Sequence, residues 1–183
     1  YVINLRNYNN GISYSGNGQP NDKALFANNM VSNAGPNAGS CLNFQGSKNV
    51  SVVYNSALID SGNANSWVLY APEAGSEVYN NSLYNGGSGT AAYFGYGNSG
   101  CISNYNNYYA DSVLPLKTYY GPYSLSSWQS YSGMDANSYS GDPFYVSTTD
   151  LHSTGSYDLN NNGVPINGIT DRKSTRLNSS HVS

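Results

Sequence analysis

The sequence predicts an all-β solenoid, and three observations support this prediction. A motif with a shared asparagine recurs four times at spacings of 27, 25 and 26 residues. Short apolar stretches alternate with turns rich in Gly, Asn and Ser, and no long apolar pattern of helical period is present. Charged residues make up only 9% of the chain. Strands too short to bury an apolar face alone, repeated at a fixed period, are typical of stacked coils.

Each repeat contains two short strand-like stretches, and we expect about four coils over residues 1–112. The first set consists of LFANNMVSN (25–33), VVYNSALID (52–60), EVYNNSLYN (77–85) and SNYNNYYAD (103–111). The second set consists of VINLRN (2–7), SCLNFQG (40–46), SWVLYAP (66–72) and TAAYFGY (90–96). Equivalent residues of neighbouring coils should lie about 4.8 Å apart.

The shared asparagines predict a buried amide ladder, in which each side chain bonds to its neighbours in the coils above and below. Its expected members are Asn28, Asn55, Asn80 and Asn106. Alternation along a strand then turns Tyr54, Tyr79 and Tyr105 outward as an aromatic strip. Such a strip either stacks on sugar rings or only stabilises the neighbouring strands.

A second polar column follows five residues after the expected ladder, at Asn33, Asp60, Asn85 and Asp111. Oxygen ligands on adjacent coils could hold Ca²⁺, which takes six to eight of them. Asn and Asp are also the usual turn residues, and the two carboxylates lie two coils apart. We therefore favour turns and expect no metal and no other cofactor.

The region after the coils, residues 113–170, predicts an irregular cap with one short helix. Ser124 is a suitable N-cap for a turn carrying Leu125 and Trp128, and Gly133 is a suitable stop. Cys41 and Cys101 lie in different strand sets two repeats apart, so we expect two unpaired thiols.

The sequence resembles right-handed parallel β-helix repeat proteins of the pectate-lyase-like fold. The coil steps YNN and VYN carry part of the resemblance. SLSSWQSYSGMDANSYSGDPFYVSTTDLH (124–152) is similar to the C-terminal portion of such proteins secreted by Bacteroidetes-type bacteria. The resemblance covers nearly all of 1–170. It implies a right-handed parallel β-helix, a structural place for His152, and polysaccharide lyases or hydrolases among similar proteins.

The last residues, DRKSTRLNSSHVS (171–183), differ sharply from the rest in composition. Asp171 to His181 resembles the translation of a common sequencing adapter at eleven consecutive positions, and we expect 171–183 to be a non-native tail. Residues 1–170 then hold four basic and nine acidic residues, a net charge of −5. We expect one domain in 1–170, cut off near Thr170, and no nucleic-acid partner.

The acids and bases of the chain do not form a convincing catalytic set. A lyase needs a base beside a cation or carboxylate cluster, and a hydrolase needs paired carboxylates about 5–9.5 Å apart. Lys23, Lys48 and Lys117 share no register with Asp60 or Asp111. Glu73 and Glu77 fall in an expected turn without a basic partner, and we interpret both as solvated charges.

These observations lead to one preferred function and two alternatives. We expect a secreted or cell-surface, monomeric, non-catalytic solenoid that binds polysaccharides or cell-surface glycans through Tyr54, Tyr79 and Tyr105. No apolar run reaches the length of about 20 residues that spans a bilayer. The first alternative is a carbohydrate-active enzyme with catalytic coils upstream, and the second is a structural stalk or adhesin repeat. Fold alone does not decide among them.

Overall fold

The computed structural model describes residues 2–6, 10–96, 100–111, 114–154 and 163–170. The non-native tail expected at 171–183 lies outside the described residues. No helix among the described residues is long and apolar enough to cross a membrane.

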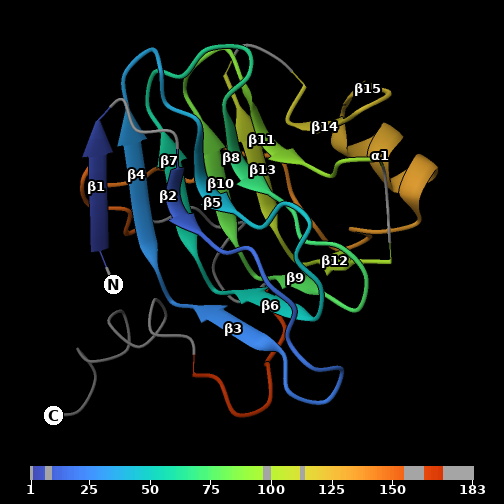
Figure 1. Ribbon diagram of the computed structural model, residues 1–183. Helices are drawn as coiled ribbons and strands as arrows, with labels where there is room; N and C mark the ends of the chain where they lie inside the picture. Colours follow the sequence, from blue (N-terminus) through green and yellow to red (C-terminus); the bar gives the residue numbers. More distant parts are fainter. Residues whose placement is uncertain (1, 7–9, 97–99, 112–113, 155–162, 171–183) are drawn as a thin grey trace, which may run out of the picture.

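The protein is a parallel β-solenoid of about four turns with one short helix, as the sequence predicts. In Figure 1 the coils succeed one another from β1 on the left to α1 on the right. The first sheet contains, in spatial order, β1 (Val2–Arg6), β4 (Met30–Ala34), β7 (Ser56–Ile59), β10 (Ser82–Asn85) and β13 (Asn107–Ala110).

Two further sheets complete the coils. The second sheet contains β2 (Asn10–Ser13), β5 (Ser40–Asn43), β8 (Trp67–Tyr70), β11 (Thr90–Tyr93), β14 (Leu116–Thr118) and β15 (Gly121–Tyr123). The third sheet contains β3 (Ala24–Ala27), β6 (Val50–Val53), β9 (Glu77–Tyr79) and β12 (Ile102–Asn104). Every pairing between these strands is parallel except that of β14 with β15, which is antiparallel. Each coil thus uses three strands, one more than the two stretches expected from the sequence.

An amide ladder runs through the coils, but its members differ from the prediction at two of four positions. The backbone N–H and side-chain amide of Asn29 donate to Asn55 Oδ1 at 3.0 and 2.9 Å. Asn55 donates in the same way to Asn81, and Asn81 to Asn106. The prediction is confirmed for Asn55 and Asn106, and it is wrong for Asn28 and Asn80, whose places in the ladder are taken by Asn29 and Asn81.

At the pairs Asn28-Asn29 and Asn80-Asn81, the second asparagine and not the first belongs to the ladder. Asn28 and Asn80 take left-handed backbone with φ of 58° and 57°, as do Tyr54 and Tyr105 with 55° and 58°. This conformation turns the chain at the corner between the third and first sheets, and the next residue then enters the ladder. A side chain with φ above zero is uncommon outside Gly, but Asn tolerates it well.

The core fills the space between the sheets and is closed at one end by α1 (Leu125–Ser132). As predicted, Ser124 caps the helix by accepting from Ser127 N, and Gly133 ends it in left-handed conformation. Trp128 is completely buried and stacks on Phe94 with 4.7 Å between ring centroids. The cap therefore covers the core at the end of the described coils.

Cys41 and Cys101 are both unpaired and buried, which confirms the prediction of two free thiols. Burial raises the pKa of Cys101 to about 12 and the pKa of Cys41 further. Both thiols therefore remain protonated at neutral pH.

Candidate aromatic binding surface

The three tyrosines predicted to bind ligand do not share one column. In the strand register Val53 pairs with Tyr79, and Tyr79 with Asn104. Tyr54 and Tyr105 occupy the left-handed corner one residue further along. Tyr79 and Tyr105 are half-buried and stack on each other with 6.4 Å between centroids.

Tyr54 is covered by a distant part of the chain. It is only 6% exposed, and its hydroxyl donates to Val164 O at 2.9 Å and accepts from Ile166 N at 3.1 Å. The continuous open strip expected from alternation is therefore wrong in its geometry, although ligand binding by these residues stays a prediction.

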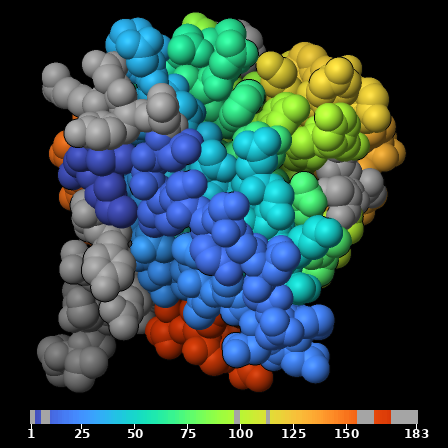
Figure 2. All heavy atoms as spheres, in the orientation of Figure 1, coloured from blue at the N-terminus to red at the C-terminus, as the bar shows by residue number. Residues whose placement is uncertain are grey.

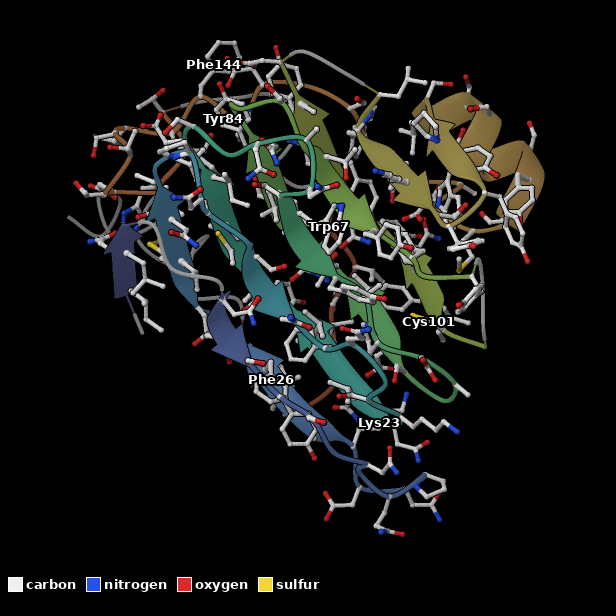
Figure 3. The ribbon with its side chains drawn as sticks, turned by 45° about the horizontal axis from the view of Figure 1, so that its top comes forward. Lys23, Phe26, Trp67, Tyr84, Cys101 and Phe144 are labelled. Atoms are coloured by element: carbon white, nitrogen blue, oxygen red, sulfur yellow. The ribbon has the colours of Figure 1, made fainter. Side chains whose placement is uncertain are left out.

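A different group of aromatic side chains gathers on the outside of the second sheet. We call it the aromatic surface; its members are Trp67, Tyr70, Tyr93, Tyr96, Tyr119 and Tyr120. Figure 3 shows Trp67 over the middle of the ribbon, with Lys23 well below it in the same view.

The irregular strands of this sheet explain why the group comes together. In β8 both Val68 and Leu69 belong to the core, so strict alternation is broken. In β11 the N–H groups of Ala91 and Ala92 both donate to Pro115 O, as at a β-bulge. Residues that flank such a pair, such as Trp67 and Tyr70, then lie on the same side.

Half of the aromatic surface is a closely packed base. Trp67 and Tyr93 lie on adjacent strands and stack at 4.7 Å with 23° between their planes. Tyr70 meets both nearly edge-on, with centroids 5.5 Å from Trp67 and 4.9 Å from Tyr93. Because these rings cover one another and are half-buried, they contribute mainly packing.

The other half is open to solvent. Tyr96, Tyr119 and Tyr120 are 73%, 67% and 68% exposed. Tyr96 and Tyr119 are 5.1 Å apart between centroids, and Tyr119 and Tyr120 are 5.7 Å apart. Tyr119 N donates to Gly95 O, which ties the turn between β14 and β15 to the turn after β11. These three rings are available to a ligand.

The phenols in the packed half of the aromatic surface, Tyr70 and Tyr93, are uncharged at neutral pH. Burial, together with the nearby Tyr96 and Tyr119, raises the pKa of Tyr93. Burial, together with Tyr93, Glu73 and Tyr96, raises the pKa of Tyr70. These phenols stay protonated at neutral pH and can both donate and accept hydrogen bonds.

Glu77 and Lys23 form an ion pair. The interpretation of Glu77 as a solvated turn charge without a basic partner is therefore wrong. Glu77 begins β9, lies 2.7 Å from Lys23 Nζ and accepts from Ser51 Oγ. Although burial acts to raise it, these two hydrogen bonds hold the pKa of Glu77 below its usual value.

The four residues considered for Ca²⁺ do not form one column. In the strand register Asn33 pairs with Ile59, one residue before Asp60. Asn33 and Asn85 are both buried, whereas Asp60 and Asp111 are exposed. Asp111 accepts from the Tyr84 hydroxyl at 3.0 Å, and Asn85 bonds to Thr90 O and Gly87 N. Among the described residues, no cluster of His, Cys, Asp or Glu could hold a metal ion.

His152 lies in the cap, where its Nδ1 contacts Asp150 Oδ1. The structural role that the resemblance implies for His152 stays a prediction.

Comparison of the chain with protein-family models, with curated proteins and with solved structures gave no match.

Proposed function

We propose that the protein is a non-catalytic β-solenoid that binds polysaccharides through the aromatic surface, outside the cell or on its surface. One observation carries the proposal. Tyr96, Tyr119 and Tyr120 lie together, each about two-thirds exposed or more, near the packed rings that include Tyr93. Monomeric proteins seldom leave large contiguous apolar patches exposed unless the patch contacts a partner. Aromatic rings with polar hydroxyls suit sugars, which have apolar C–H faces and hydroxyl edges.

Retention on immobilised polysaccharides tests this proposal. The panel contains mixed-linkage β-glucan, xylan, polygalacturonate and alginate. We expect retention on at least one polymer, weakened about tenfold in Tyr119→Ala and in Tyr120→Ala, which corresponds to about 1.4 kcal/mol of binding free energy. Phe144→Ala is the matched control, because Phe144 is an exposed aromatic residue (57%) of the cap outside the aromatic surface.

The same samples distinguish the alternatives. Formation of unsaturated product or of new reducing ends would establish an enzyme and refute the non-catalytic proposal. Equal retention of wild type, Tyr119→Ala and Tyr120→Ala would refute the proposed surface. No retention on any polymer would favour a stalk. Tyr79→Ala and Tyr105→Ala, assayed alongside, test the residues predicted from the sequence.

A further inference from the structure

Four side chains form a row at the corner between the third and first sheets. Asn28, Tyr54, Asn80 and Tyr105 occupy equivalent places in successive coils, each in left-handed backbone just before a ladder asparagine. We call this row the corner row. It presents two amides and two phenols along the axis of coil stacking.

Residues 163–170 lie across the corner row as a strap. Asn80 Nδ2 donates to Val164 O at 2.7 Å, and Asn80 Oδ1 accepts from Val164 N at 2.9 Å. The Tyr54 hydroxyl bonds to Val164 O and Ile166 N, and Asn28 Nδ2 donates to Thr170 O at 3.0 Å. Figures 1 and 2 show this red segment beside the blue residues of β3.

The strap is held mainly through its own main chain. All five of these bonds join a side chain of the corner row to a main-chain N–H or C=O of the strap. Residues 163, 165, 167, 168 and 170 are exposed, and the other three are half-buried. A segment with few buried contacts belongs to the low-stability part of a fold.

The groups that hold the strap are also groups that hold sugars. An amide that donates and accepts toward one partner can serve two neighbouring sugar hydroxyls in the same way. A phenol that bridges a donor and an acceptor can do so as well, and its ring offers a face for stacking. The strap therefore occupies polar positions that a polyhydroxylated ligand would use.

We propose that the corner row is a second carbohydrate-binding site, and that the strap 163–170 is a displaceable internal occupant of it. This inference rests on the proposed function and adds a regulated site to it. While the strap is in place, only the aromatic surface binds the polymer. Release of the strap uncovers Tyr54 and Asn80 and strengthens retention.

Gly163→Val in the full chain tests the proposal. A Cβ at position 163 would lie 3.0 Å from Asn80 Oδ1, which is already crowded, and we expect the branched valine side chain to force the strap and Asn80 apart. Val164→Pro is a second release variant, because it removes the N–H that Asn80 Oδ1 accepts. Asn167→Ala, at an exposed position of the strap, is the matched control.

Two measurements are made on each variant. Nitration of Tyr54 by tetranitromethane, located by mass spectrometry with exposed Tyr119 as internal reference, reports release of the strap. Retention on the polysaccharide panel reports binding. We expect both release variants to nitrate at Tyr54 and to bind at least about threefold more tightly, because apparent affinity rises with the fraction of uncovered sites.

The gain should disappear when Asn80→Ala is combined with either release variant, while retention through Tyr119 and Tyr120 persists. Nitration of Tyr54 without tighter binding would overturn the proposal, as would the absence of nitration in both variants. Neither result would affect the aromatic surface, whose test depends on Tyr119 and Tyr120.

Discussion

At the scale of single residues, one position in the register separates a buried ladder member from a corner residue. The sequence predicted the amide ladder, and Asn55 and Asn106 belong to it. Where two asparagines are adjacent, the alignment of the repeats does not determine which of them turns inward. The evenness of the repeat is a usable signal, because the true ladder has spacings of 26, 26 and 25 residues.

The ladder predicts that substitution of Asn81 lowers the free energy of unfolding more than substitution of its neighbour Asn80. Asn81→Ala leaves the buried backbone N–H of Asn55 without its acceptor and removes the side-chain bonds from Asn81 to Val52 O and Asn106 Oδ1. The change should lower the free energy of unfolding by about 3 kcal/mol. Asn80→Ala places Ala in left-handed backbone and removes two part-buried bonds to residue 164, and should cost less, about 1.5 kcal/mol. Urea denaturation of both variants measures the difference, and equal losses would contradict the register.

The two buried thiols predict a loss of stability at alkaline pH. Burial raises the pKa of Cys101 from 9.0 to about 12, so between these values the unfolded chain loses a proton that the folded chain keeps. The stabilisation is complete below pH 9 and is lost as pH rises toward 12. From pH 9 to 10 we expect a fall of about 1 kcal/mol per thiol in the free energy of unfolding.

Denaturation curves at pH 8, 9 and 10 measure this dependence, and Cys101→Ala should reduce it. At pH 8 a thiol reagent such as DTNB should label both cysteines only after unfolding. Rapid labelling of the folded protein would contradict the burial.

At the scale of elements, the helix was predictable from local signals, whereas its anchor was not. Ser124 and Gly133 mark the ends of α1 in the sequence. Nothing local indicates that Asp135 lies beneath it and accepts from Trp128 Nε1 at 2.8 Å and from Ser103 Oγ at 3.0 Å. The aromatic surface was missed for a related reason, because strict alternation places Trp67 and Tyr70 on opposite sides.

The anchor predicts that Asp135→Ala detaches the cap from the coils. The change leaves the Trp128 indole N–H and buried hydroxyls without acceptors, and we expect a loss of about 3 kcal/mol in the free energy of unfolding. Trp128 should also become more exposed, which shifts tryptophan fluorescence to longer wavelength. Asp142→Ala is the control, since the Asp142 side chain accepts from Phe144 N at a partly exposed position. Similar losses in both variants would contradict a special role for Asp135.

At the scale of the whole molecule, the coils behave as repeated units because each mainly contacts its neighbours. The number of coils and their parallel stacking followed from the period of the sequence. The strap did not, because residues 163–170 carry no repeat signal and contact positions more than 80 residues earlier.

The repeat predicts that one complete coil can be removed. Deletion of residues 55–80, which joins Asn81 to Tyr54, removes the 26 residues that separate Asn55 from Asn81 in the ladder. Asn29 would then meet Asn81, and we expect a folded, less stable solenoid with a β-type circular dichroism spectrum. Deletion of half a coil, residues 55–67, should prevent cooperative unfolding because it places ladder and core residues out of register. Equal behaviour of the two deletions would contradict independent coils.

The direction of the ladder has an electrical consequence for the cap. Asn29, Asn55 and Asn81 each donate one side-chain N–H to the amide oxygen of the next ladder asparagine. The amide dipoles therefore add along the stacking axis, with the positive end at Asn106. Asn106 Nδ2 lies 3.4 Å from Asp135 Oδ1. Burial raises the pKa of Asp135, whereas hydrogen bonds from Ser138, Trp128, Ser103 and Asn106 oppose that rise. The column of coils thus ends in a partial positive charge that favours the ionised form of the Asp135 carboxyl and opposes the effect of burial.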